Sequence, residues 1–120
     1  MPVNFLIMGL GALLGGVLLV TFWDEIVDWL KKLVSKLKEV FRNVARKIAH
    51  AAGAFIQRVE NGLAALRHKL YYKEEGQWVE ETTTRKIKES EVPASIRARI
   101  SAQEEEVTDE VESELNLSLN

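Results

Sequence analysis

Apolar residues recur in a fixed eleven-residue pattern between Ile26 and Leu66, which few secondary structures can accommodate. Four consecutive sets share the same steps of four, three and four residues. The sets are Ile26, Leu30 and Leu33; Leu37, Phe41 and Val44; Ile48, Ala52 and Phe55; and Val59, Leu63 and Leu66. Eleven residues in three turns is close to the period of a straight α-helix, so the apolar stripe stays on one side. The repeat therefore predicts one long amphipathic helix over residues 24–70.

The N-terminal segment carries no charged side chain from Phe5 to Trp23, a run of nineteen residues. Such a run can cross the hydrocarbon core of a bilayer as a helix, so residues 1–23 are predicted to form a transmembrane anchor. A cleaved signal peptide is the alternative, but no basic side chain precedes the run and residues 21–24 make a poor cleavage site. The lysines that follow the run predict an N-terminus outside and a C-terminal part in the cytoplasm.

Two further segments follow the repeat. Residues 71–88 are rich in β-branched and aromatic residues on both sides of Glu75-Gly76, which predicts a β-hairpin with its turn at this dipeptide. Residues 89–120 contain Ser90-Glu91-Val92-Pro93, in which a polar cap precedes a proline in the first turn, a helix-start signal; an acidic, partly disordered tail is expected to follow. The predicted fold is therefore mainly α, with an anchor, a long amphipathic helix, a small hairpin and a short C-terminal helix.

The frame of the repeat extends backwards into the anchor, where it meets Gly11 and Gly15. Small residues four apart let transmembrane helices approach closely, so anchor and long helix are predicted to share one interface in a parallel, coiled-coil homo-oligomer. The predicted interface comprises Gly11, Gly15, Leu19, Phe22, Ile26, Leu30, Leu33, Leu37, Phe41, Val44, Ile48, Ala52, Phe55, Val59, Leu63 and Leu66. A fold-back at Gly53 is an alternative, against which the unbroken frame argues.

The same helix can instead lie flat on the inner leaflet, because lysines flank its apolar stripe. Tryptophan suits the headgroup zone, and lysine can extend its ammonium group from the stripe to anionic headgroups. The predicted membrane-surface residues are Trp23, Trp29, Lys31, Lys32, Lys36 and Lys38. The sequence leaves the bundle and the surface helix open, and the frame shared with the anchor favours the bundle.

The net charge of −2 hides an asymmetry along the chain. Residues 24–69 hold ten basic and five acidic side chains, whereas residues 73–120 hold six basic and thirteen acidic ones. The lipid bilayer, and no nucleic acid, is therefore the expected partner of the basic helix. The acidic tail is expected to be solvated or to meet a basic protein partner.

No arrangement of residues in the sequence predicts catalysis, a cofactor or a metal site. The chain has no cysteine, and His50 and His68 lie off the apolar stripe without further ligands at helical spacing. Both histidines are therefore expected on the surface. The paired glycines lie inside the predicted anchor, where they serve helix packing rather than phosphate binding. We expect a protein that is not an enzyme.

These expectations favour a non-enzymatic single-pass membrane protein that self-assembles and presents a cytoplasmic scaffold, docking or sensing module. One alternative is a membrane-permeabilising effector or channel of the lysis or toxic-effector type, formed by oligomerised transmembrane helices. Against a permanently open aqueous pore, residues 5–22 offer only Thr21 as a polar lining. Another alternative is a protein whose amphipathic helix binds membrane surfaces or curvature.

Overall fold

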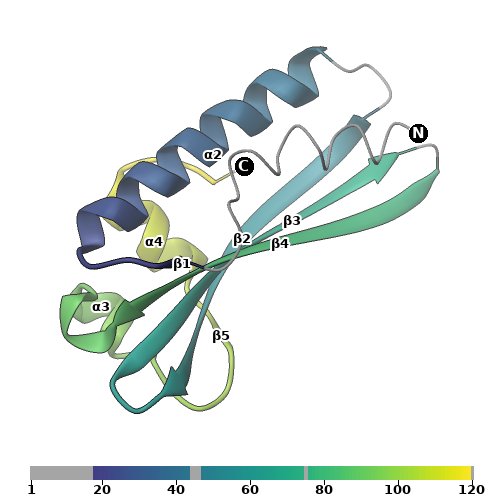
Figure 1. Ribbon diagram of the computed structural model, residues 1–120. Coiled ribbons are helices and arrows are strands. Elements are labelled where there is room, and N and C mark those ends of the chain that lie inside the picture. Colours follow the sequence, from purple (N-terminus) through teal and green to yellow (C-terminus); the bar gives the residue numbers. More distant parts are fainter. Residues whose placement is uncertain (1–17, 44–46, 75, 120) are drawn as a thin grey trace.

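The computed structural model describes residues 18–43, 47–74 and 76–119. They form a five-stranded mixed sheet with helices on one face (Figure 1). The elements in chain order are β1 Leu18–Leu19, α2 Trp23–Asn43, β2 Lys47–Glu60, β3 Leu63–Glu74, β4 Gln77–Lys88, the 3-10 helix η1 Glu89–Glu91, α3 Ala94–Arg97, β5 Glu105–Glu106 and α4 Thr108–Leu115. The strands lie in the order β1-β4-β3-β2-β5, and of these β1 alone runs parallel to its neighbour.

The helix α2 is held in the fold by the first part of the apolar repeat. Asp24 and Glu25 occupy its first turn, where acidic side chains complement the helix dipole. Four residues of the repeat are buried in the core that α2 shares with the sheet: Ile26, Leu30, Leu33 and Leu37. Burying a side chain of this size contributes about 1.5–3 kcal/mol. Side chains that the sequence assigned to contacts between copies thus pack within one chain.

The strands β2, β3 and β4 form an antiparallel meander with two tight turns. Glu60 pairs with Leu63, which leaves a two-residue turn in which Gly62 has a φ of 76°. Gly76, at the second turn, has a φ of 81°, a conformation that glycine adopts without a steric penalty. Strands β3 and β4 pair without a register shift from Leu63–Lys88 to Glu74–Gln77. The meander therefore has two regular faces.

Side chains along the meander alternate between these faces, and this period of two replaces the helical period beyond Lys47. The face toward α2 is apolar and buried, and β2 contributes Ala52, Ala54 and Ile56 to it. Strand β3 adds buried residues at every second position, namely Ala64, Leu66, His68, Leu70 and Tyr72. We call the opposite side the open face; Lys69 lies there over the ring of Phe55, with 4.6 Å between Nζ and the ring centroid.

The C-terminal part packs beside α2 and completes the core between the helices and the sheet. Val107 N donates a hydrogen bond to Ala54 O (2.8 Å), and Ala54 N donates one to Thr108 Oγ1 (3.0 Å), which joins the start of α4 to β2. Beyond this junction, apolar side chains at helical spacing and one in the final segment are buried: Val107, Val111, Leu115 and Leu119. In Figure 1, α4 lies beside α2 on the same side of the sheet. The acidic segment is thus an integral part of the domain.

The predicted mainly helical fold is wrong. The structure has a helix over Trp23–Asn43, and from Lys47 to Glu74 it has β2 and β3 where the sequence predicted a continuation of that helix. Within the segment for which the sequence predicts a partly disordered tail, the structure has β5 at Glu105–Glu106 and α4 at Thr108–Leu115, and Leu119 is buried. Residues 47–74 form strands rather than a helix because their alternating side chains bury one face of the sheet against α2. Most polar side chains then point to the opposite face. The hairpin turn at Gly76 and the end of β4 at Lys88 lie at the predicted positions, but β3 begins at Leu63, eight residues before the predicted start at residue 71.

No helix in the described part of the chain is long and apolar enough to cross a membrane. Most of the predicted anchor, including Gly11 and Gly15, lies outside the described residues, and Leu18–Leu19 at its end form β1. The prediction of a self-assembling single-pass membrane protein is therefore contradicted, and so are the channel and surface-helix alternatives. The self-assembling helix and the surface helix need a continuous helix over residues 24–70, and that helix ends at Asn43. The channel needs a membrane-spanning helix, which no described helix provides.

Candidate functional site

The predicted oligomer interface is divided among different environments. Ile26, Leu30, Leu33, Leu37, Ala52 and Leu66 are buried, Phe55 and Leu63 are half-buried, and Leu19, Phe22 and Val59 are exposed. Phe41 lies in α2 and Ile48 in β2, and Val44 lies outside the described residues. Ala52 faces the core, whereas Phe55 lies on the open face. The described residues of the predicted interface therefore do not form one continuous helical surface.

The predicted membrane-surface residues all lie on α2. Trp23 is half-buried, and Trp29 is buried beneath Arg85, whose guanidinium carbon lies 4.7 Å from the ring centroid. The lysines Lys31, Lys32 and Lys38 are exposed, and Lys36 is half-buried with its Nζ 3.9 Å from Glu39 Oε1. The two tryptophans thus contribute to the core of the domain, and the lysines line the outer side of its main helix.

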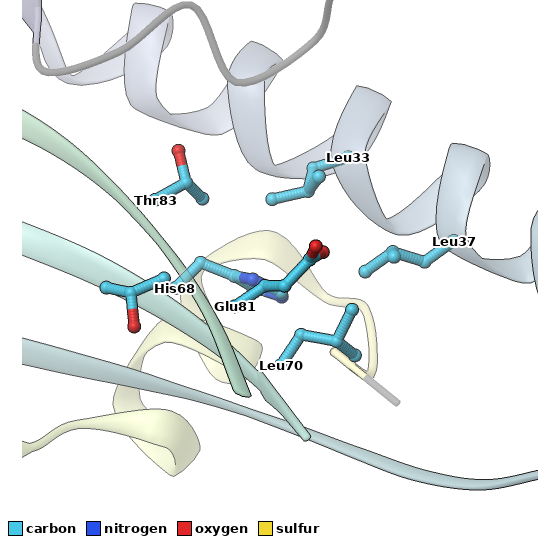
Figure 2. A pocket seen from close by; sticks show the side chains of 7 residues that line it. Leu33, Leu37, His68, Leu70, Glu81 and Thr83 are labelled. Atoms are coloured by element: carbon cyan, nitrogen blue, oxygen red, sulfur yellow. The ribbon is translucent and has the colours of Figure 1, made fainter. Parts of the chain in front are cut away.

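One small cavity lies between α2 and the sheet. Figure 2 shows Leu33 and Leu37 of α2 on one side of it, facing His68, Leu70, Glu81 and Thr83 of β3 and β4. Its volume is about 10 Å³, which is room for about one water molecule. His68 Nε2 and Thr83 Oγ1 are buried here and have no hydrogen-bond partner among the described residues. The cavity is too small for a substrate, so its polar groups are a feature of the core.

His68 is 2% exposed, which corrects the prediction that it lies on the surface. The side chain at position 68 faces the core because side chains along β3 alternate between the two faces of the sheet. A helix over the same residues would place it beside the apolar stripe, on the surface. Burial disfavours the imidazolium ion and lowers the pKa of His68 to about 4. The side chain is therefore neutral at pH 7. A neutral, enclosed imidazole is a titratable part of the core rather than an accessible catalytic base.

The open face carries a cluster of paired charges near its middle. Arg67 Nη1 lies 2.9 Å from Glu104 Oε2, and Lys69 Nζ pairs with the other oxygen of the same carboxylate. Burial raises the pKa of Glu104, but Lys69 and Arg67 lower it more, and the net shift is downward. One of the tail's carboxylates is thus engaged within the domain.

Exposed aromatic side chains gather toward the β3–β4 turn on the open face. Trp78 is 64% exposed, and Tyr71 is exposed on the neighbouring strand. Tyr71 pairs across the strands with Glu80, and its hydroxyl donates a hydrogen bond to Glu80 Oε1 (3.4 Å). Thr82 Oγ1 donates a longer one to the same oxygen (3.5 Å). Exposed tryptophan and tyrosine beside a positioned carboxylate are typical of a binding surface rather than of a solvated face.

The outer side of β4 is covered over only a short stretch. Strand β1 pairs with Arg85 and Lys86, and Val20 N donates to Lys86 O (2.8 Å). Because backbone groups alternate along a strand, every second residue before Lys86 also directs its N–H and C=O away from β3. These residues are Trp78, Glu80, Thr82 and Thr84. The pairing of Leu18 with Arg85 brings β1 to the C=O of Thr84, and no strand of the described part of the chain lies beside the other three. We call the outer side of residues 77–84 the β4 edge.

The β4 edge carries the charges of Glu80 and Glu81 but lacks the other devices that usually protect an exposed strand. Residues 77–84 contain no lysine and no proline, and the pairing with β3 has no bulge there. Three consecutive threonines, Thr82 to Thr84, favour an extended backbone. The sequence predicts a hairpin for these residues and no role. The signal that could have marked them is the β-branched run after Trp78.

No group of three or more histidine, cysteine, aspartate or glutamate side chains within residues 18–43, 47–74 and 76–119 could hold a metal ion. No protein family, curated protein or solved structure matches the chain. The β4 edge and the exposed aromatic residues beside it are therefore the candidate site.

Proposed function

We propose that this domain is a binding module that accepts an extended segment of another polypeptide as an added strand along the β4 edge. The observation that carries the proposal is the length of β4 beyond β1, where Trp78, Glu80 and Thr82 direct backbone donors and acceptors outward. An added strand satisfies such groups with main-chain hydrogen bonds, and its alternate side chains contact the neighbouring strand. This assigns the chain a binding role without catalysis.

The rest of the fold supports this role because it holds the edge in place. Strand β4 is paired along its whole length with β3, and Thr83, Arg85 and Ile87 are buried on the side of α2. A receptor strand that is already ordered loses little conformational entropy when a partner binds. Trp78 adds an exposed apolar surface beside the backbone groups. Together these features provide both main-chain and side-chain contacts.

The substitution Thr82→Pro tests the proposal. It removes one outward N–H and keeps the hydrogen bonds to β3, because the backbone groups of Thr82 point the other way. Thr82→Ala is the matched control, since it changes the side chain and keeps the N–H. Peptides selected from a random displayed library on the wild-type domain should bind Thr82→Ala and fail to bind Thr82→Pro.

Amide hydrogen exchange locates the binding. In the isolated domain, the amides of Trp78, Glu80, Thr82 and Thr84 should exchange rapidly, and a selected peptide should slow all four. Selected peptides that leave these amides unchanged would place the binding site elsewhere. Slow exchange of the four amides in the isolated domain would mean that other residues of the chain, or a second copy, already cover the edge. Either result overturns the proposal.

A further inference from the structure

The charge of the β4 edge differs from that of the strands behind it. Residues 77–84 contain Glu80 and Glu81 at their centre and no basic residue. Glu80 lies on the open face and is exposed, and its carboxylate accepts hydrogen bonds from Tyr71 and Thr82. Of the basic side chains on the open face, Arg67 and Lys69 pair with Glu104, Lys73 lies on β3 opposite Trp78, and Lys86 lies next to β1. An incoming strand therefore meets a negative edge.

These glutamates disfavour a second copy of the chain as the added strand. Antiparallel pairing of two β4 strands keeps the open faces on one side only if even-numbered residues face even-numbered ones. Of these registers, the two that pair the longest stretch of residues 77–84 are centred on positions 80 and 81. The first places Glu80 opposite Glu80 of the second copy, and the second places Glu81 opposite Glu81. Like charges directly opposite each other destabilise a strand pair. Registers centred on Val79 or Thr82 pair only residues 77–81 or 80–84 of this edge, and β1 blocks extension of the second one to Lys86.

We infer, on the basis of the proposed function, that the partner is a basic extended segment with arginine or lysine at alternate positions. In the inferred complex, one basic side chain pairs with Glu80 across the new strand boundary. The basic side chain two residues along lies over the exposed ring of Trp78. A cation over a tryptophan face is a favourable contact, and arginine makes it most often. Lys73 also neighbours Trp78, but it lies on β3, away from the incoming strand.

The domain uses the same contact within its own fold. Arg85 lies over Trp29 and Lys69 over Phe55, at 4.7 and 4.6 Å from the respective ring centroids. Trp78, by contrast, is the most exposed of the described tryptophans. Its ring and the Glu80 carboxylate lie two residues apart on one face of β4, which matches the spacing of alternate side chains on an added strand. The geometry and the charge thus select the same class of partner.

Three synthetic peptides of equal length test this inference: alternating threonine–arginine, threonine–glutamine and threonine–glutamate. Binding to the full chain is measured by fluorescence anisotropy of the labelled peptide. The arginine peptide should bind most tightly and the glutamate peptide most weakly. Glu80→Lys should reverse this order, with a change of roughly fivefold or more for each charged peptide. Glu114→Lys makes the same charge change on an exposed position of α4 and should leave the order intact. Thr82→Pro should abolish binding of all three peptides.

The outcomes separate the inference from the proposed function. Equal binding of the three peptides, lost in Thr82→Pro, would show that the edge accepts strands without regard to charge, so the inference alone fails. An arginine peptide that binds Glu80→Lys and Thr82→Pro as well as it binds the wild type would show attraction to the acidic chain elsewhere, and the inference fails. No binding, together with slow exchange of the edge amides, overturns both the inference and the proposed function. Sedimentation then shows whether a second copy covers the edge, and a monomer would assign the cover to the chain itself.

Discussion

Acidification should destabilise the domain through His68. The buried imidazole has a pKa of about 4 in the folded domain, against 6.5 for an exposed histidine. Between these values the unfolded chain binds a proton that the folded chain does not, so the free energy of unfolding falls as the pH is lowered. The difference in pKa corresponds to about 3 kcal/mol, lost between pH 6.5 and pH 4. This is a large share of the stability of a small domain.

The measurement is urea denaturation at several pH values between 7 and 4, followed by circular dichroism. His68→Leu removes the titrating group and keeps the site filled with a side chain of similar size. Carboxylates also contribute to acid destabilisation, but they are common to both proteins, so the difference between the two pH profiles isolates His68. Thr83→Val is the matched control, because it alters the same cavity without changing a titrating group. It should keep the wild-type dependence on pH.

Parallel pH profiles for the wild type and His68→Leu would refute this reasoning. They would mean that the imidazole binds its proton equally well in both states, through solvent access or an acidic partner. A pH dependence that disappears equally in Thr83→Val would likewise assign the effect to the cavity rather than to the proton. His68→Gln provides a second non-titrating variant if the leucine side chain does not fit.

The remaining predictions concern the core, a turn and a surface ion pair. Leu33→Ala should lower the free energy of unfolding by about 2–5 kcal/mol, since Leu33 is buried, whereas Phe22→Ala at a 59% exposed position should change it by less than about 1 kcal/mol; equal effects in urea denaturation would contradict the assigned core. Gly76→Ala should cost roughly 1–2 kcal/mol, because alanine is strained at a φ of 81°, and an unchanged thermal midpoint would argue against that turn. Glu104→Gln should cost about 1 kcal/mol in dilute buffer and less in high salt, and an effect that salt does not reduce would exclude an ionic contribution from Lys69 and Arg67.

The eleven-residue repeat describes α2 but does not identify where the helix ends. Up to Leu37 the apolar residues that it selects are buried together, because a real helix presents them on one side. Beyond Lys47 the same spacing selects Ala52 on one face of β2 and Phe55 on the other. The alanine-rich sequence after Lys47 is compatible with a helix or a strand. The choice between them depends on packing between segments that are distant in sequence, and a local repeat carries no information about that packing.

A second signal in the sequence was available and outweighs the repeat. Asn61-Gly62 is a strong hairpin-turn dipeptide, and in the structure it connects β2 to β3. Around it, Leu66 and Leu70 alternate with Arg67 and Lys69, a period of two that places apolar and basic side chains on opposite faces. The β4 edge could not be predicted in the same way. Its exposure depends on β1 pairing with Arg85 and Lys86, a contact between segments distant in sequence.

The parallel pairing of β1 with β4 also sets an order of events during synthesis. Leu18 is among the first described residues to leave the ribosome, yet its partner Arg85 lies near the end of β4 and follows α2, β2 and β3. The meander consists of neighbouring hairpins and can form from local contacts as it emerges. Residues 18–20 therefore reach the sheet after the strands that they border, although they are made before them. Until then the outer side of β4 is open over its full length, and a nascent chain at that stage is more exposed to wrong strand pairing than the completed domain.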